Sequence, residues 1–216
     1  TNPMDAIRFF KETGTDALAI SYGTMHGANK GKNAVVRKEI AIAVKECMRH
    51  EHIQGVLVSH GSSTVPKYIV DEINALGGNI QNAYGIPVEQ LIEVSHLGIG
   101  KINVDTDIRL AVTRNIREFF VNNPSYRSDE HIGPIWELME KNRAAFDPRV
   151  FLPPVMDTVM YGNVPSESVQ ILTDLIRKGV MEVVGTLIVQ FGSVGKAGLV
   201  EVKSLDEMAE FYRKKD

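Results

Sequence analysis

Short, almost uninterrupted apolar runs alternate in the first half of the chain with stretches in which apolar residues recur every three or four positions. The runs lie at 16–21, 55–59 and 101–104. The recurring stretches lie at 3–13, 37–50, 66–76 and 87–97. The runs predict β-strands and the stretches predict amphipathic helices, the first of which Asn2 would cap. Strands that alternate with helices indicate parallel βα units.

Two α/β folds are compatible with this alternation. Strands that are apolar along their whole length fit a parallel sheet covered on both faces, as in a βα barrel or a doubly wound open sheet. Both folds place their ligand sites at the carboxyl ends of the strands. The polar and glycine-bearing residues of this chain follow the predicted strands, so their position leaves both folds open.

From residue 109 onward the pattern changes to helices separated by breaks that contain proline. The breaks lie at 123–124, 147–148, 153–154 and 164–165. We therefore expect two parts. Residues 1–115 carry the strands, and residues 116–216 form a helical appendage that serves in oligomerisation or as a lid.

Composition limits the class of protein. The 216 residues are 44% hydrophobic with a net charge of −3, which gives no reason to expect nucleic-acid or membrane binding. No apolar run approaches the ~18–20 residues of a membrane helix. A single cysteine, Cys47, and no signal peptide favour a cytoplasmic location. Because a helix begins almost at once without an initiator methionine, we expect the chain to start within a fold.

Two His-Gly pairs, His26-Gly27 and His60-Gly61, follow the first two predicted strands. Neighbouring strands lie ~4.8 Å apart, so imidazoles at matched strand ends would lie within a few ångströms of each other. They could share one Zn²⁺ through their nitrogens. Either histidine alone would more often be an ordinary loop residue, but the matched positions favour a shared site. Catalytic zinc normally takes three protein ligands, so a third must come from elsewhere.

The residues beside these histidines are suited to an anion. Ser62, Ser63 and Thr64 offer amide and hydroxyl donors, and Lys30 offers a positive charge. Glycines at 27 and 61 allow the backbone to approach a ligand closely. Ordinary turn residues and a solvated lysine would produce the same pattern, so this feature alone does not decide between the two interpretations.

A polar cluster also follows the third predicted strand. Asn103 and Asp105 fall on the same side of that strand by its two-residue period, so they are expected to point into the site together. Thr106 and Asp107 have a simpler explanation, because acidic and hydroxyl residues at the start of a helix can cap it without any further function.

Five blocks of sequence, in this order, resemble the second half of class II fructose-bisphosphate aldolases. They are TGTDALAISYGTMHGANKG, VLVSHGSSTVP, GGNIQNAYGIPVEQLIE, GKINVDTDIRLA and AFDPR. The resemblance is close over 1–114 and looser at 146–149 and 190–197. It implies a TIM (βα)8 barrel of which this chain supplies the last three βα units, with residues 1–115 as the C-terminal part of the barrel. The N-terminal half would lie outside this chain.

The resemblance also implies roles for single residues. His26 and His60 would be two of the zinc ligands, and Asn103 would contact the enediolate oxygens of the substrate. The residues implied in phosphate binding are Gly27, Lys30, Gly61, Ser63, Asp105 and Thr106. Arg149 resembles an arginine that reaches the substrate phosphate of a neighbouring subunit. A monovalent cation is a further candidate cofactor beside Zn²⁺.

The implied reaction is the zinc-dependent cleavage of fructose 1,6-bisphosphate to dihydroxyacetone phosphate and glyceraldehyde 3-phosphate, and its reverse, in glycolysis and gluconeogenesis. The family's Asp-His pair supplies the base and the remaining zinc histidine. No such pair occurs here, so the chain alone should be inactive. Two alternatives stay open: a tagatose-bisphosphate aldolase, and a catalytically silent subunit for phosphosugar binding or assembly. A homo-oligomer, dimer or tetramer, is also implied.

The sequence departs from the family's pattern in a few places. Met25, Asn29 and Thr64 stand where the resemblance leads us to expect Ser, an aromatic residue and Ser. These changes are mild. Residues 161–178 resemble an insertion relative to shorter family members, and the sequence assigns them no function.

Overall fold

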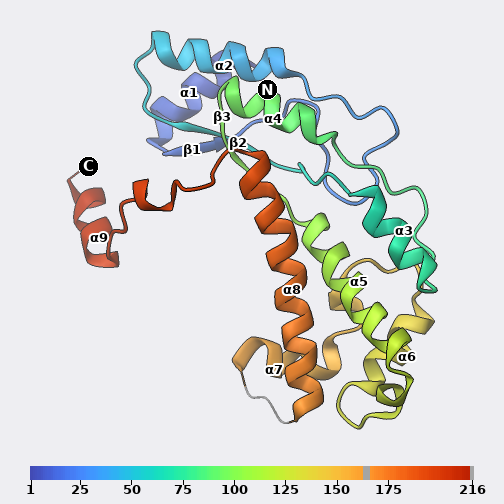
Figure 1. The fold of residues 1–216 in the computed structure, drawn as a ribbon. Coiled ribbons are helices and arrows are strands. Elements are labelled where there is room, and N and C mark those ends of the chain that lie inside the picture. Colours follow the sequence, from blue (N-terminus) through green and yellow to red (C-terminus); the bar gives the residue numbers. More distant parts are fainter. Residues whose placement is uncertain (163–165, 215–216) are drawn as a thin grey trace.

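A parallel sheet of three strands, with helices between them, forms the first part of the structure (Figure 1). The computed structural model describes residues 1–162 and 166–214. The strands are β1 (Ala17–Ala19), β2 (Val56–Ser59) and β3 (Ile99–Ile102), which lie side by side in chain order. The helices of this part are α1 (Pro3–Thr13), α2 (Lys38–His50), α3 (Lys67–Ala75) and α4 (Val88–His96). The predicted alternation of strands and helices is confirmed.

The ends of these elements agree with the sequence-based prediction to within one or two residues. Asn2 caps α1 as expected, because its side chain accepts a hydrogen bond from the backbone N–H of Met4 at 2.9 Å. The third strand was predicted two residues too late. Gly98 and Gly100 interrupt its apolar pattern and concealed its beginning, although Ile99 is buried and pairs with Leu57.

The sheet buries one face against helices. Leu18, Leu57 and Ile99 pair across the sheet and pack into a core made with α1, α2 and α4. The opposite face carries small apolar residues that are open to solvent at Ala17, Ala19 and Gly100; on β2, Val56 is 42% exposed and Val58 is buried. An apolar sheet face of this kind is a candidate for covering by further structure.

The remainder of the described chain is helical, and none of its described residues after 102 is in a strand, as predicted. The α-helices are α5 (Thr106–Asn122), α6 (Gly133–Lys141), α7 (Met156–Tyr161), α8 (Glu167–Gln190) and α9 (Leu205–Arg213). Short 3-10 turns lie at Pro124–Ser128, Pro148–Val150, Pro153–Val155 and Ala197–Leu199. The predicted break at 164–165 lies outside the described residues. The predicted division at 115/116 falls within α5 and stays a prediction.

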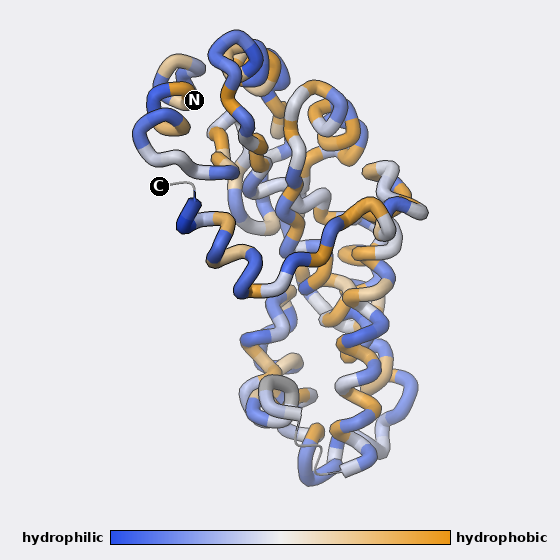
Figure 2. The backbone as a smooth tube through the Cα atoms, turned by 90° about the vertical axis from the view of Figure 1, so that its left-hand side faces the viewer, coloured by the Kyte–Doolittle hydropathy of each residue, from blue (hydrophilic) through white to orange (hydrophobic). Residues whose placement is uncertain are grey.

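Helices α5 and α8 lie side by side and form the centre of this helical part (Figure 1). Their shared core includes Ile116, Phe120, Val169 and Leu172. Hydrophobic and hydrophilic residues alternate along the helices, as amphipathic packing requires (Figure 2). Within the described part of the chain, every helix is either too short or too polar to span a bilayer.

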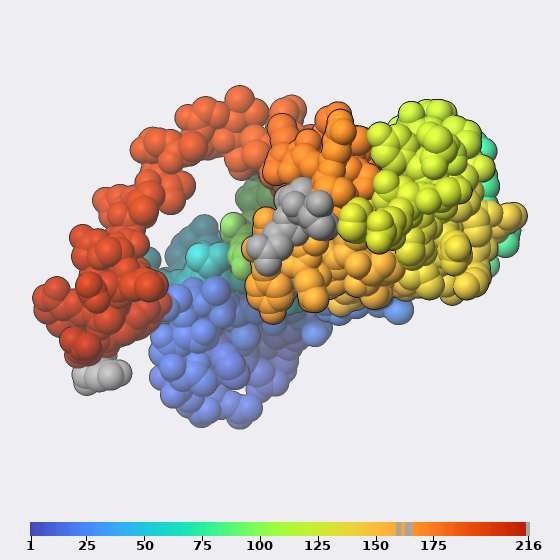
Figure 3. All heavy atoms as spheres, turned by 90° about the horizontal axis from the view of Figure 1, so that it is seen from below, coloured from blue at the N-terminus to red at the C-terminus, as the bar shows by residue number. Residues whose placement is uncertain are grey.

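After α8 the chain leaves the helical pair and forms an arc that stands off from the rest of the molecule (Figure 3). Residues 192–207 are exposed throughout, among them Leu199 and Val202. The arc ends in α9, which returns to the sheet, where the Tyr212 hydroxyl donates to the Asp16 carboxylate at 2.7 Å.

The packing of α5 on α8 depends on a small residue at Gly179. A Cβ there would lie 2.9 Å from the backbone nitrogen of Val112, whereas a Cβ at Gly185 would meet nothing within 4 Å. We expect Gly179→Ala to lower the free energy of unfolding by about 1–3 kcal/mol through overpacking. The matched change Gly185→Ala should raise it by about 0.5–1 kcal/mol through helix propensity. Urea unfolding measures both, and equal effects at the two positions would contradict this account.

Candidate active site

The loops that follow β1, β2 and β3 meet at one edge of the sheet and enclose a cavity of about 200 Å³. The residues that line it are His26, Gly27, Lys30, His60, Gly61, Ser63, Asn103, Asp105 and Thr106. All nine are residues that the sequence analysis selected. The structure therefore brings them together, while the role of each stays a prediction.

The two histidines face the same space. Their ring centroids are 5.8 Å apart, with planes inclined by 59°. The Nε2 of His60 lies 3.2 Å from the side-chain Nδ2 of Asn103. Gly61 makes this approach possible, since a Cβ there would lie 2.6 Å from the carbonyl group of Met25. Its φ of 63° also falls in the left-handed region that favours glycine.

Two neighbouring imidazoles fit two of the ligand positions of a zinc ion. Within residues 1–162 and 166–214, however, no group of three histidine, cysteine or acidic side chains lies close enough to hold a metal. The donor set of His26 and His60 thus fits Zn²⁺ as part of a larger set of ligands. The expected third ligand from outside this chain stays a prediction.

Lys30 brings a positive charge into the cavity from a buried position. The residue is only 5% exposed, its Nζ donates to the carbonyl oxygen of Met25, and its backbone N–H donates to the Tyr84 carbonyl at 2.8 Å. Burial lowers the pKa of Lys30, and the negative charge of Asp107 opposes the shift. An anion in the cavity would gain a charged partner that solvent screens poorly.

Ser63 joins the loop after β2 to the start of α5. Its Oγ accepts hydrogen bonds from the backbone N–H groups of Asp105, at 3.2 Å, and Thr106, at 3.0 Å. Its own proton is thus left to be donated into the cavity. An anion bound there would meet this hydroxyl at the positive end of the α5 dipole.

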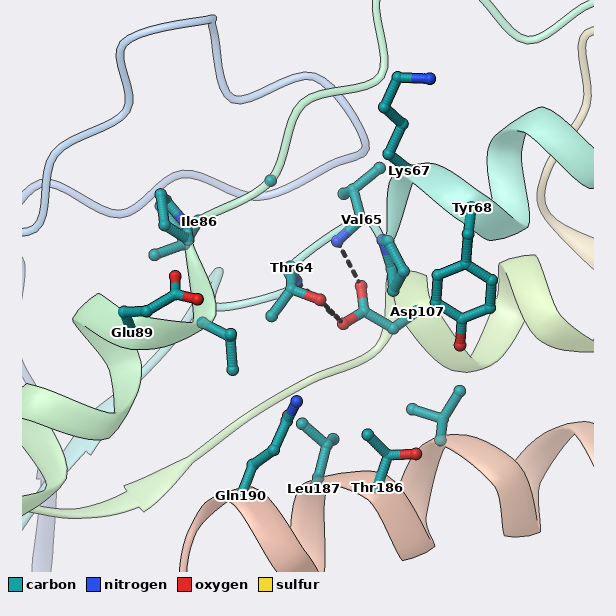
Figure 4. Close-up of a pocket in the computed structure, with 15 residues that line it drawn as sticks. Thr64, Val65, Lys67, Tyr68, Ile86, Glu89, Asp107, Thr186, Leu187 and Gln190 are labelled. Carbon is teal, nitrogen blue, oxygen red and sulfur yellow. Dashed lines mark hydrogen bonds between the residues drawn. The ribbon is translucent and has the colours of Figure 1, made fainter.

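Asp107 has a role that sequence analysis missed. Its carboxylate accepts from the Thr64 N–H at 2.9 Å, the Thr64 hydroxyl at 2.8 Å and the Val65 N–H at 2.8 Å (Figure 4). It therefore holds the loop after β2 rather than capping its own helix. The loop needs this support, because Val65 is a β-branched residue at a φ of 50°. Burial raises the pKa of Asp107, although these three donors and Lys30 oppose the shift.

A second and larger cavity, of about 560 Å³, is lined by Asp107 and lies between the starts of α3 and α4 and the side of α8 (Figure 4). Tyr68, Leu187 and Gln190 are among its lining residues, but neither histidine is. The smaller cavity is therefore the candidate site, because it alone of the two combines metal-binding nitrogens with anion-binding donors.

Arg149 does not line either cavity. Its guanidinium pairs with Asp147 at 2.7 Å, Asp147 also pairs with Arg109, and Arg109 pairs with Asp105 at 2.7 Å. The Arg149 side chain is 69% exposed. It stands at one end of a chain of ion pairs whose other end, Asp105, lines the smaller cavity. Its predicted action on a neighbouring subunit stays a prediction.

Comparison with known proteins gives a consistent result. The family model described as "Fructose-bisphosphate aldolase class-II" matches residues 1–196. A fructose-bisphosphate aldolase of Giardia intestinalis is 36% identical over 214 residues, which are 99% of this chain and 53% of that protein.

Bacterial relatives give a similar picture. Fructose-bisphosphate aldolase 2 of Cereibacter sphaeroides is 33% identical over 98% of this chain and 49% of its own length. The enzyme of Stutzerimonas stutzeri is 46% identical over 127 residues, 58% of this chain and 35% of that protein. The chain spans about half the length of the curated relatives that it matches along its whole length.

The lowered pKa of Lys30 predicts a pH dependence. The pKa of Lys30 lies below its ordinary value of 10.5. As the pH rises through this lowered pKa, the lysine loses its charge, so the affinity of the protein for inorganic phosphate should fall. Asp107→Asn removes the negative charge that raises the pKa of Lys30. In this variant the loss of phosphate affinity should therefore occur at a still lower pH. Lys30→Met should bind phosphate about tenfold more weakly and lack the fall. Calorimetric titration above about pH 8, where the charge of phosphate changes little, measures this. Equal pH dependence in wild type and Lys30→Met would contradict it.

Proposed function

Because the chain belongs to the class-II fructose-bisphosphate aldolase family, we propose that it forms part of an enzyme that cleaves fructose 1,6-bisphosphate by a zinc-dependent aldol reaction. The products would be dihydroxyacetone phosphate and glyceraldehyde 3-phosphate. The single observation that supports this most is the cavity in which His26 and His60 lie beside the anion-binding groups of Lys30 and Ser63.

In this proposal the chain's own residues bind and orient one end of the substrate. Lys30 and the hydroxyl of Ser63 hold a phosphate at the start of α5, and Gly27 and Gly61 let the backbone approach it. Asn103 then offers its carboxamide to the oxygens next to the bond that breaks. Binding energy from the phosphate, which does not react, fixes the reacting carbons over the two histidines.

His26 and His60 would hold Zn²⁺ together with a ligand from outside this chain. Bound zinc supplies Lewis-acid stabilisation of the negative charge that develops on the ketone oxygen when the carbon–carbon bond breaks. The proton-transferring aspartate is also assigned to sequence outside this chain. Asp105 is the one carboxylate among the described residues that line the cavity; it is paired with Arg109 and is assigned to phosphate binding instead.

We propose further that the three strands are the last three of a (βα)8 barrel. The uncovered apolar face at Ala17, Val56 and Gly100 supports this, since the interior of such a barrel is packed with side chains. Among the described residues β1 and β3 have no outer neighbour in the sheet, which supports it as well, because exposed strand edges favour aggregation and closure into a barrel removes them. Residues 116–216 would serve oligomerisation. The exposed Arg149 would be directed at the phosphate site of a neighbouring subunit. A monovalent cation is a candidate second ion.

A catalytically silent subunit is the second candidate. The observation that favours it is the presence of only two metal-binding nitrogens in the cavity, among the described residues. Such a subunit would bind a phosphosugar through Lys30 and Ser63 and would not turn it over, even at saturating zinc.

The activity of a complete preparation tests these proposals. We expect protein that includes sequence equivalent to the first half of the relatives to cleave fructose 1,6-bisphosphate, to lose activity to a chelator and to regain it with Zn²⁺. His26→Ala and His60→Ala should each lower kcat/KM by about 100-fold or more. His96→Ala, an exposed histidine at the end of α4, is the matched control and should change little.

Intact mass under denaturing conditions identifies every polypeptide in that preparation. Turnover by the 23.9 kDa chain alone, or turnover that a chelator leaves unchanged, would contradict the zinc mechanism with its divided site. Binding without turnover in a complete preparation would favour the silent subunit. Faster cleavage of tagatose 1,6-bisphosphate would reassign the substrate.

The state of the isolated chain tests the barrel. We expect the chain alone to self-associate through its uncovered sheet face, and Val56→Lys to shift it toward a monomer, because a charge there opposes apolar contact. Val35→Lys, at an exposed loop valine, is the matched control and should not change the oligomeric state. Size-exclusion chromatography with light scattering measures the mass. A monodisperse monomer of the unaltered chain would contradict the proposed barrel.

A further inference from the structure

Three buried hydroxyl groups form a chain of hydrogen bonds beneath the turn that carries His60. The hydroxyl of Tyr22 bonds to the Oγ of Ser59, and that oxygen bonds to the Oγ of Ser62. The Ser62 Oγ in turn lies 3.3 Å from the carbonyl oxygen of His60. All three side chains are almost fully buried, and none of them lines the candidate site.

The direction of each bond follows from the last acceptor. A carbonyl oxygen can only accept, so Ser62 donates to His60. Ser59 must then donate to Ser62, and Tyr22 to Ser59. Burial raises the pKa of Tyr22, an effect that its bond with Ser59 only partly offsets, so the phenol keeps its proton at neutral pH. Each hydroxyl group thus donates to a single acceptor, and the three hydrogen bonds have one direction.

The chain of hydroxyls is anchored at both strands that it connects. Tyr22 follows β1, and its carbonyl oxygen accepts from the Arg37 N–H at 2.7 Å. Ser59 is the last residue of β2, and its carbonyl oxygen accepts from the Asn103 N–H at 2.9 Å. The far end of the chain lies on the peptide between His60 and Gly61. Glycine does not restrict the rotation of that peptide by itself, so an external contact is needed to set it.

We propose that Tyr22 is a positioning residue, whose hydroxyl acts through Ser59 and Ser62 to fix the His60 peptide and thereby the direction in which the His60 imidazole enters the cavity. This inference rests on the proposed function, in which His60 holds the metal. A partner that contacts a metal-binding imidazole directly changes metal affinity by about 10–100-fold. Tyr22 acts through a backbone turn, so we expect a change of about 3–10-fold.

Tyr22→Phe tests the proposal, since it removes only the hydroxyl group. In the complete protein we expect Co²⁺, used as a spectroscopic probe of the zinc site, to bind about 3–10-fold more weakly. With selective ¹⁵N-histidine and ¹⁵N-glycine labelling, the amide signals of His60 and Gly61 should shift, and those of His96 and Gly185 should not. Tyr126→Phe, at a half-buried tyrosine in the helical part, is the matched control and should change neither measurement.

A triple variant separates positioning from stability. Tyr22→Phe leaves the Ser59 hydroxyl without its donor, whereas Tyr22→Phe with Ser59→Ala and Ser62→Ala removes all three buried hydroxyl groups and should restore much of the stability. The weakened Co²⁺ binding should persist in the triple variant, because the His60 carbonyl stays cut off from β1. Recovery of metal affinity along with stability would show a purely structural role and overturn the proposal.

Unchanged Co²⁺ affinity and unchanged His60 and Gly61 signals in folded Tyr22→Phe would also overturn the proposal. If the wild-type protein binds no Co²⁺, the proposed function fails by itself. The amide signals then decide separately whether the hydroxyl chain sets the turn.

Discussion

The parallel register of β1, β2 and β3 is the constraint on which the candidate site depends. Parallel strands in chain order place their three following loops at one edge of the sheet. The pairing of Leu18 with Leu57, and of Leu57 with Ile99, sets how far each loop extends beyond that edge. A slip of one residue would turn these side chains away from the core, so apolar packing on one face maintains the register. Residues that do not line the cavity thus determine where it forms.

Buried polar contacts then turn three separate loops into one surface. Ser63 satisfies two amides at the start of α5, and Asp107 satisfies two amides in the loop that contains Ser63. The two residues therefore hold each other's segments in a reciprocal arrangement. Burying a carboxylate is costly unless its oxygens are hydrogen-bonded, and the three donors around Asp107 meet that need. Disturbing either residue would loosen both loops together.

The fold and much of the candidate site could be predicted from local sequence, because a parallel sheet covered on both faces is built from uninterrupted apolar runs and helix packing imposes a period near 3.6. Where glycines removed that signal, at Gly98 and Gly100, the strand was misplaced. The histidines stood out because each follows a strand and precedes glycine. Asp107 and Tyr22 did not stand out in the sequence. Their hydrogen-bond partners lie 43 and 37 residues away along the chain, and no local pattern predicts such a contact.

The return of α9 to the sheet has a consequence for the order of folding. The contact between Tyr212 and Asp16 closes a loop of 196 residues, whereas β1, β2 and β3 meet over much shorter separations. The exposed arc before α9 adds little apolar burial to offset the entropy of that closure. Docking of α9 is therefore a late event of folding, and its release is among the first steps of unfolding. Among the described residues, the arc offers a protease a long exposed segment of the native chain.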